Sequence, residues 1–331
     1  MWLILSTILT VIAGIFAALA LFWVLNKIAE LLPSRIEQRL KPYFYILPAY
    51  LAITAYLIYP SILTVINSFR SNNSFKKKGV SEWVGFGNYT DLFHDSGFVQ
   101  AFINTILWVI IVPFVSITIG LLVAVLVDRL GPKSEKTAKT VIFLPMAISA
   151  VAAATVWRFV YTYQIPPEPQ IGLLNATWTA FGAEPVPWLT INDLKLNSLL
   201  LMVMMLWSQI GFSMVLLSAA VKAVPTDTIE AARVDGATEV QIFRRVVVPQ
   251  ILPTIITVFV TVTIGVMKVF DVVYVMTGGN FDTSVLGMEF FNMFKTINSG
   301  SASAIVVILM IAIIPIMIFQ VRQFRREEAN R

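Results

Sequence analysis

The 331-residue sequence contains no cysteine, a single histidine and few charged residues. Without cysteine the chain forms no disulfide and no thiolate metal site, so thiol usage says nothing about its compartment. With His94 alone it lacks the paired histidines of the metalloprotease zinc motif, and we expect His94 to be an ordinary loop residue. Charged residues make up 13% of the chain, against about a quarter in soluble domains. A soluble fold is therefore not expected.

Apolar residues are instead abundant and gathered into long runs. They make up 57% of the chain, and the mean hydropathy is +0.80. A helix needs about 20 apolar residues to cross a bilayer core, and uncharged, non-alternating runs of this length do not suit barrel strands. The sequence therefore predicts an all-α integral membrane protein with seven transmembrane helices. The runs are residues 2–25, 43–69, 97–127, 140–157, 196–221, 246–267 and 296–321.

The distribution of Lys and Arg predicts the orientation, because cytoplasmic connections are rich in both. Most of the 24 lie in alternate connections, so we expect the N-terminus outside and the C-terminus in the cytoplasm. The cluster at Lys76, Lys77 and Lys78 falls on the outer side, against this trend. Basic residues at membrane boundaries indicate anionic lipid as a partner, and not nucleic acid. The supporting residues are Lys27, Arg35, Arg39, Lys41, Arg129, Lys133, Lys136, Lys139, Lys222, Arg233, Arg244, Arg245, Arg322, Arg325, Arg326 and Arg331.

The connection 222–250 carries helix signals of its own. Asp227 is predicted as an N-cap, with Glu230 three residues later completing a capping box. Gly236 can adopt the left-handed backbone conformation that ends a helix, and Thr238 can start a second short helix. The sequence thus predicts a helix–turn–helix on the inner face of the membrane. By these signals alone, an ordinary surface hairpin remains an equal alternative.

A motif within this connection resembles the EAA loop of ABC importer permeases. The motif is Glu-Ala-Ala, three residues, Gly, nine residues and an apolar stretch ending in Pro, and Val246-Val247-Val248 supplies the apolar stretch here. In that family the loop is a coupling helix that docks in a groove of the ATPase subunit. The resemblance implies that the coupling residues are Glu230, Ala231, Ala232, Asp235, Gly236 and Pro249.

Further stretches resemble the carbohydrate-uptake branch of these permeases, which includes maltose and glycerol-phosphate permeases. They are similar above all to α-glucoside and glucosylglycerol permeases. The resemblance covers residues 43–326 and implies a type I importer bundle, with an N-terminal helix and link at 1–42, the permease domain at 43–331 and the coupling loop at 223–250. The stretches include Tyr59-Pro60, Gly87-Asn88-Tyr89, Phe143-Leu144-Pro145, Gln170 to Ala176, Phe270-Asp271 and Gly279 to Thr283.

The same resemblance implies partners. They are a dimer of ATP-binding subunits, a second permease that completes a heterodimer, and an extracytoplasmic solute-binding protein. The chain lacks the Gly-x-x-x-x-Gly-Lys-[Ser/Thr] phosphate loop, so ATP and Mg²⁺ are expected on the ATPase partner and this chain is not expected to be an enzyme. The expected location is the cytoplasmic (inner) membrane.

Polar residues inside two predicted helices suggest where cargo binds. By the resemblance, Ser208, Gln209 and Phe212 fall at sugar-contacting positions, and their spacing places them on one sector of a helix. Asp271 and Tyr274, which we expect in the sixth span just beyond its uncharged run, are further candidates, because ionisable residues within a span are costly. The alternatives are helix-packing contacts for the first set and pairing of Lys268 with Asp271 for the second.

These observations predict a permease subunit for a small carbohydrate: an α-glucoside, a disaccharide or a glucosylglycerol-type solute. Other polyols or a glycerol-phosphate-like solute remain alternatives, as does a non-transporting assembly or receptor subunit. A secondary transporter is disfavoured, because the sequence shows no paired broken helices with intramembrane carboxylates.

Overall fold

The computed structural model describes residues 2–30, 33–71 and 82–329, which form helices joined by turns and loops, with one isolated β-bridge between Arg70 and Trp83. The Lys76 to Lys78 cluster lies outside these residues. The chain divides into two units, Met1–Ile66 and Asn67–Arg331.

The first unit is a pair of helices. α1 (Trp2–Glu30) packs along α2 (Ser34–Ile53), which continues through a π-helical turn (Thr54–Ile58) into α3 (Tyr59–Ser68). The Tyr45 hydroxyl donates to Asn26 Oδ1 (3.0 Å), and the Tyr45 ring stacks on Phe22 at a centroid distance of 6.0 Å. Residues 5–28 and 41–68 are each long and apolar enough to cross a membrane.

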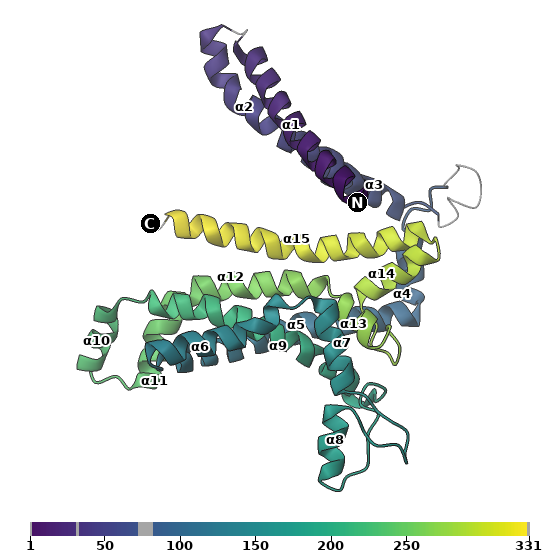
Figure 1. The fold of residues 1–331 in the computed structure, drawn as a ribbon, viewed down its shortest axis with the longest axis vertical. Coiled ribbons are helices and arrows are strands. Elements are labelled where there is room, and N and C mark those ends of the chain that lie inside the picture. Colours follow the sequence, from purple (N-terminus) through teal and green to yellow (C-terminus); the bar gives the residue numbers. More distant parts are fainter. Residues whose placement is uncertain (1, 31–32, 72–81, 330–331) are drawn as a thin grey trace. The chain divides into compact units, whose positions relative to one another are not determined.

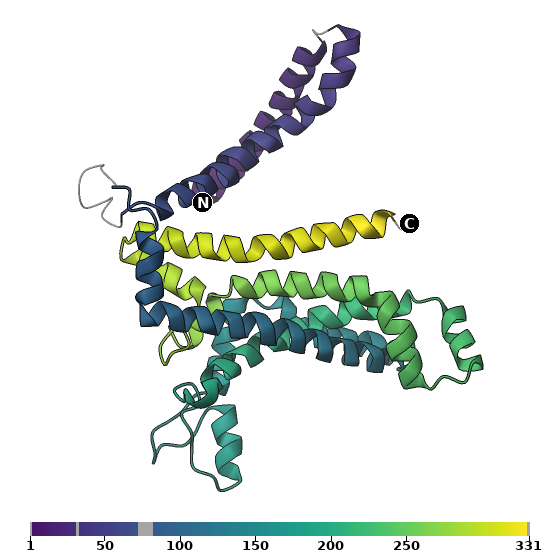
Figure 2. The ribbon, with the colours of Figure 1, turned by 180° about the vertical axis from the view of Figure 1, so that it is seen from behind.

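The second unit holds the remaining helices (Figures 1 and 2). Among its described residues, four continuous helices are long and apolar enough to span a membrane: α5, α9, the helix that ends with α12, and α15. The bounds are α4 (Gly87–His94), α5 (Ser96–Asp128), α6 (Pro132–Phe143), α7 (Ala150–Val160), α8 (Leu173–Ala180), α9 (Leu196–Lys222), α10 (Thr226–Val234), α11 (Glu239–Ile242), α12 (Val248–Met267), α13 (Asp271–Met276), α14 (Leu286–Lys295) and α15 (Ser299–Ala329).

The predicted helix at 140–157 is not continuous. α6 passes into a 3₁₀ turn (Leu144–Ala147), and α7 then starts at an angle of 99° to it. Pro145 has no N–H to donate, and Ser149 caps the new helix by accepting from Ala152 N (3.3 Å). The described chain therefore has six continuous candidate spans, or seven if this bent pair is one span.

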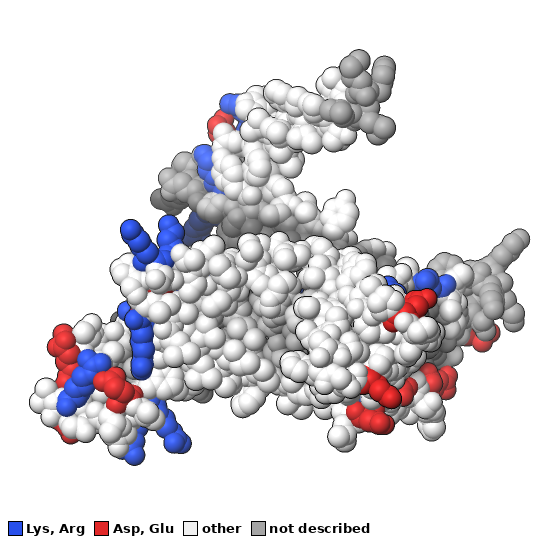
Figure 3. Space-filling view, turned by 60° about the horizontal axis from the view of Figure 1, so that its bottom comes forward, with Lys and Arg blue, Asp and Glu red and all other residues white. Residues whose placement is uncertain are grey.

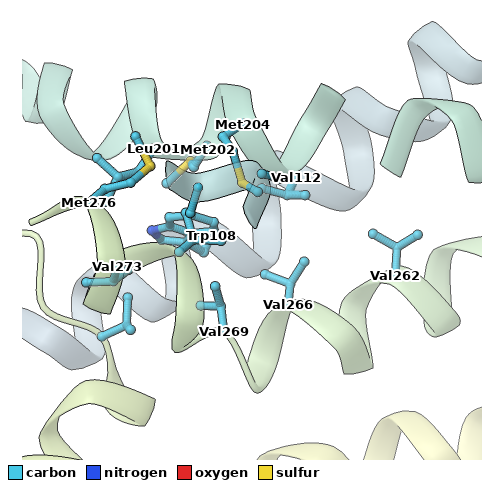
Figure 4. Packing of buried hydrophobic residues seen from close by; sticks show 14 of the residues in the cluster. Trp108, Val112, Leu201, Met202, Met204, Val262, Val266, Val269, Val273 and Met276 are labelled. Atoms are coloured by element: carbon cyan, nitrogen blue, oxygen red, sulfur yellow. The ribbon is translucent and has the colours of Figure 1, made fainter. Parts of the chain in front are cut away.

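The core of the second unit surrounds Trp108 of α5, which is fully buried (Figure 4). Leu201, Met202 and Met204 of α9 approach it from one side, and Val266 and Val273 lie on the other. α9 and α12 both pack directly on α5, whose other face is exposed.

One glycine sets the distance between α5 and α9. A Cβ on Gly120 would lie 2.7 Å from Ser213 Cβ and 3.0 Å from Met214 N. Small residues at helix contacts let membrane helices approach closely. Gly120 and Ser213 therefore fix the tightest part of this packing.

The two ends of the unit are built differently. At one end, the buried side chains of Asn104 (α5) and Asn197 (α9) donate to the backbone of the α13–α14 loop: Asn104 to Asp282 O (2.7 Å) and Ser284 O (2.8 Å), and Asn197 to Phe281 O (2.7 Å). The opposite end carries α10 and α11, which project beyond the bundle (Figure 1).

Candidate functional site

The predicted helix–turn–helix is present between α9 and α12. α10 ends at a turn in which Gly236 has φ +80° and Ala237 N donates to Ala232 O (3.0 Å). Only glycine takes this conformation without steric cost, so the predicted left-handed end is confirmed. Thr238 caps α11 through a capping box with Gln241, which confirms the predicted second helix.

The predicted start of α10 is wrong. The helix begins at Thr226, its N-cap is Pro225, and no side chain caps it. Asp227 is therefore inside the first turn, and the capping box with Glu230 does not form. Proline at 225 fixes the backbone at the boundary, which leaves Asp227 only a favourable interaction with the helix dipole.

An ion pair fastens the two arms of this hairpin. Arg233 of α10 donates from Nε to Glu239 Oε1 (2.8 Å) and from a second guanidinium nitrogen to Oε2 (3.3 Å). The hydrogen bond to this carboxylate raises the pKa of the Arg233 guanidinium above its usual value, with a Coulombic contribution from the same group. The pair spans the Gly236 turn and fixes the distance between α10 and α11.

The hairpin also has its own apolar core. Val224, Ile242, Val247 and Ile251 are buried together, and Ile229 packs against them. This side faces the ends of α9 and α12, so the other side of α10 faces outward. Glu230 and Ala231 lie on that exposed side.

Two exposed valines extend this outward face. Val234 is 87% exposed and Val240 is 75% exposed, on either side of the Gly236 turn. The rest of the described chain therefore leaves both apolar side chains almost uncovered. The amino-acid pattern did not predict the exposure of either valine.

Several predicted coupling residues line one open pocket of about 380 Å³ on the hairpin. Its lining is Ala232, Asp235, Gly236, Ala237, Gln241, Arg245 and Val246. A Cβ on Gly236 would meet no atom within 4 Å, so a partner has room to approach the backbone there. Pro249 is not part of this lining and lies near the start of α12.

Beside the hairpin, four charged side chains join three helices. Lys139 (α6) contacts Glu135 Oε1 (2.6 Å) and Asp128 Oδ1 of α5 (3.2 Å). Lys222, at the end of α9, contacts the same two carboxylates. Figure 3 shows most of the Lys and Arg side chains, mixed with Asp and Glu, around the α10–α11 end, and mainly Asp and Glu at the opposite end, with an uncharged band between the two ends. This cluster ties the base of the hairpin to α5 and α6.

The three candidates on α9 lie on one helix and are half-buried. Ser208 Oγ donates to Met205 O of its own helix (3.0 Å), and Phe212 packs against the main core. Neither Ser208 nor Phe212 is sealed inside the bundle, so each keeps an accessible edge.

The two candidates expected in the sixth span do not lie in the helix that forms it. α12 ends at Met267, Lys268 caps it, and Asp271 begins the short helix α13. In the described chain no ion pair joins Lys268 to Asp271, and both are exposed. Tyr274 stacks on Phe270 at 5.1 Å and meets the Phe291 ring edge-on at 5.4 Å. Among the described residues no hydrogen bond, ion pair or ring contact joins Asp271 or Tyr274 to the three α9 candidates, so the five candidates form two separate groups.

Comparison with known proteins identifies the class to which this architecture belongs. The family model described as binding-protein-dependent transport system inner membrane component matches residues 116–328. The chain belongs to this family, the permease subunits of ABC transporters, and is a multi-pass protein of the inner membrane. The family predicted from the EAA motif is therefore confirmed.

Individual relatives match along nearly the whole chain. It is 41% identical to the alpha-glucoside transport system permease protein AglF of Rhizobium meliloti, over 99% of both chains. It is 45% identical to the osmoprotective compounds uptake permease protein GgtC of Synechocystis, over 87% of this chain and all of that one. A bacterial alginate ABC transporter, solved with an alginate pentasaccharide-bound periplasmic protein, shares the fold (TM-score 0.73, 21% identity, 88% of this chain and 96% of that chain).

Proposed function

We propose that this permease is one of two membrane subunits of an ATP-driven importer for a small carbohydrate, an α-glucoside or glucosylglycerol-type solute. The observation that carries the proposal is the α10–α11 hairpin, a fastened, projecting element with exposed valines and an open pocket at Gly236. The cargo class rests on the names of its two relatives, one an alpha-glucoside permease and the other a permease for osmoprotective compounds.

The hairpin is the docking element for an ATP-binding subunit. Glu230, Ala231, Ala232, Asp235 and Gly236 present small side chains and two carboxylates, so the backbone comes close to the partner and the carboxylates pair with its basic groups. A dimer of such subunits holds ATP and Mg²⁺, and a second permease and an extracytoplasmic solute-binding protein complete the importer. Pro249, the remaining predicted coupling residue, lies in the first turn of α12.

In this proposal the hairpin end of the second unit faces the cytoplasm and the C-terminus is inside. With the bent pair α6–α7 counted as one of seven spans, the N-terminus is then outside. The enrichment of Lys and Arg at this end supports the orientation. The permease domain is residues 43–331, with a separate helix and link at 1–42 and the coupling loop at 223–250.

Reporter fusions test the orientation. A reporter after Lys136 is expected to be active in the cytoplasm, and one near Asn175 outside it. The Asn175 side chain makes hydrogen bonds with Thr162 O, with the backbone N and O of Val186 and with Trp188 Nε1. Residues 162–188 are therefore tied together as one connection, and a reporter near Asn175 reports the side of the membrane on which this whole connection lies. A cytoplasmic reporter at that connection would reverse the assignment.

Cargo is bound in the membrane by the α9 group Ser208, Gln209 and Phe212, which combines a hydroxyl, an amide and a ring. Sugar hydroxyls need hydrogen-bond partners, and sugar faces pack on rings. Asp271 and Tyr274 form a second group at the outer end, where the Tyr274–Phe270–Phe291 rings present an aromatic surface.

An ATPase assay separates this function from that of an assembly or receptor subunit. The complete complex in proteoliposomes, with its solute-binding protein, is expected to hydrolyse ATP faster when sucrose or glucosylglycerol is added. Hydrolysis that no sugar changes, together with no uptake, would favour the non-transporting alternative. Uptake that an ion gradient drives without ATP would favour a secondary transporter.

A further inference from the structure

One face of α12 carries a row of polar side chains. Gln250, Thr254, Thr257 and Thr261 recur at the spacing i, i+4, i+7 and i+11, which places them on one side of the helix, and all four are at least partly exposed. At 1.5 Å per residue the row is about 16 Å long. It starts at the hairpin end and covers roughly half of a bilayer core of about 30 Å.

The opposite face of the same helix is apolar where it is exposed. Leu252 is 47% exposed and Phe259 is 42% exposed, as expected of positions that meet lipid. Thr263 also lies away from the polar row; its hydroxyl is buried and bonds to no group in the described structure. α12 therefore has two exposed faces of different chemistry.

The hydroxyls of the polar row are arranged to accept hydrogen bonds. Thr257 Oγ1 donates to Pro253 O (3.0 Å) and Thr261 Oγ1 donates to Thr257 O (2.8 Å), which leaves the oxygen lone pairs free. The Gln250 amide and Thr254 hydroxyl have no partner among the residues that the structure describes. Hydrocarbon offers none either, so this row is suited to water or to a polar solute.

The end of this row nearest the hairpin opens into a pocket beside α9. Gln250 and Thr254 line a pocket of about 140 Å³ together with Ala220 of α9 and Ala223, the residue that follows this helix. Along α9, Ser208, Phe212, Ala219 and Ala223 follow one face at helical spacing. Because that face ends at this pocket, the α9 cargo group and the polar row of α12 are on the same side of the unit.

We propose that Gln250, Thr254, Thr257 and Thr261 line the inner half of the transport path, from the α9 group to the cytoplasm. Each sugar hydroxyl both donates and accepts hydrogen bonds. As the sugar moves along α12, it can therefore leave one polar side chain and form a hydrogen bond with the next. The alanines of α9 leave room beside this row. The inference rests on the proposed carbohydrate transport, and it adds residues to which neither the motif nor the relatives assign a role.

Cysteine substitution tests the path directly, because the chain has no cysteine of its own. Thr254→Cys and Thr257→Cys are compared with Leu252→Cys and Phe259→Cys, each in the complete complex in membranes, using a charged, water-soluble thiosulfonate. The reactive thiolate forms in water and is suppressed in apolar surroundings, so the first pair is expected to react at least about tenfold faster.

Equal or slower labelling at 254 and 257 would overturn the proposal. So would labelling that appears only when the subunit is separated from the second permease, since the row would then be an interface between subunits. ATP-driven uptake of labelled sucrose and glucosylglycerol is measured on the cysteine-free complex in parallel. Fast labelling without any sugar uptake would contradict the carbohydrate function and still support a water-filled path.

A transport measurement with matched threonines completes the test. The double variant Thr254→Val/Thr257→Val removes two hydroxyls from the row at nearly constant volume, and Thr263→Val removes the unpartnered hydroxyl from the other side. Losing a hydrogen bond lowers binding by up to about tenfold, so uptake is expected to fall several-fold in the double variant and to stay unchanged in Thr263→Val. Equal uptake in both, with equal assembly, would show that the hydroxyls play no part.

Discussion

Arg233 and Glu239 lie on opposite sides of the Gly236 turn and meet through two hydrogen bonds of 2.8 and 3.3 Å. A two-point contact between a planar guanidinium and a carboxylate fixes orientation as well as distance. The pair therefore controls how α10 and α11 are held, and with them the face that carries Val234 and Val240.

The first prediction concerns this pair. Arg233→Gln is expected to loosen the hairpin and to weaken co-purification of the ATP-binding subunit by less than about tenfold, since exposed ion pairs contribute little. The charge-swapped variant Arg233→Glu/Glu239→Arg is expected to recover most of the loss. Arg244→Gln, an exposed position on the same hairpin, serves as the control. No recovery in the swapped variant would mean that Arg233 contacts the partner directly.

The second prediction concerns Gly236, whose φ of +80° excludes most side chains. Asn tolerates the left-handed region and β-branched residues do not, so Gly236→Asn is expected to assemble and Gly236→Val to lose the ATP-binding subunit. Glu230→Lys, which leaves the turn intact, is expected to lose coupling by charge reversal alone. Assembly of all three variants is measured by co-purification of the ATP-binding subunit, and coupling by sugar-stimulated ATPase activity. Normal assembly of Gly236→Val and Glu230→Lys would remove the docking role.

The third prediction concerns cargo. Gln209→Ala and Phe212→Ala are expected to lower uptake or change cargo preference by up to about tenfold per lost hydrogen bond or ring contact, with assembly and basal ATPase activity intact. Ser213→Ala on the same helix is the control, because its buried hydroxyl has no partner in the described structure. If the α9 group only packs helices, both variants should lose assembly first.

The fourth prediction concerns packing between α5 and α9. Gly120→Ala is expected to destabilise the purified complex by roughly 1–3 kcal/mol, the usual free-energy cost of overpacking, because the added Cβ meets Ser213 Cβ at 2.7 Å. The loss is measured as a lower melting temperature. Gly120→Ala/Ser213→Gly should recover part of this loss. Gly265→Ala is the control, since its Cβ would meet no atom within 4 Å. Equal melting temperatures for Gly120→Ala and Gly265→Ala would contradict the packing described here.

The features that the sequence predicted well have local causes. Gly236 and Thr238 determine the end of one helix and the start of the next through their own backbone preferences, so both were predictable. Apolar run length likewise predicted most spans. The helix break after Phe143 was missed because a proline within an apolar run is also compatible with a kinked continuous helix.

Features that depend on tertiary contacts were beyond the sequence. Asp227 is a good N-cap by type, but Pro225 starts α10 two residues earlier. Asp271 was expected within the sixth span, but α12 ends at Met267 and Asp271 begins the separate helix α13. The exposure of Val234 and Val240 depends on how the hairpin packs on α9 and α12, and no local pattern reports that.

The central claim is that this permease moves a small carbohydrate when its hairpin is engaged by an ATP-hydrolysing partner. Uptake of labelled sucrose and glucosylglycerol into proteoliposomes bearing the complete complex and its solute-binding protein tests it most directly. The account predicts accumulation with ATP, none with a non-hydrolysable analogue, and none in the Glu230→Lys complex. Accumulation that persists without hydrolysable ATP, or in that variant, would contradict it.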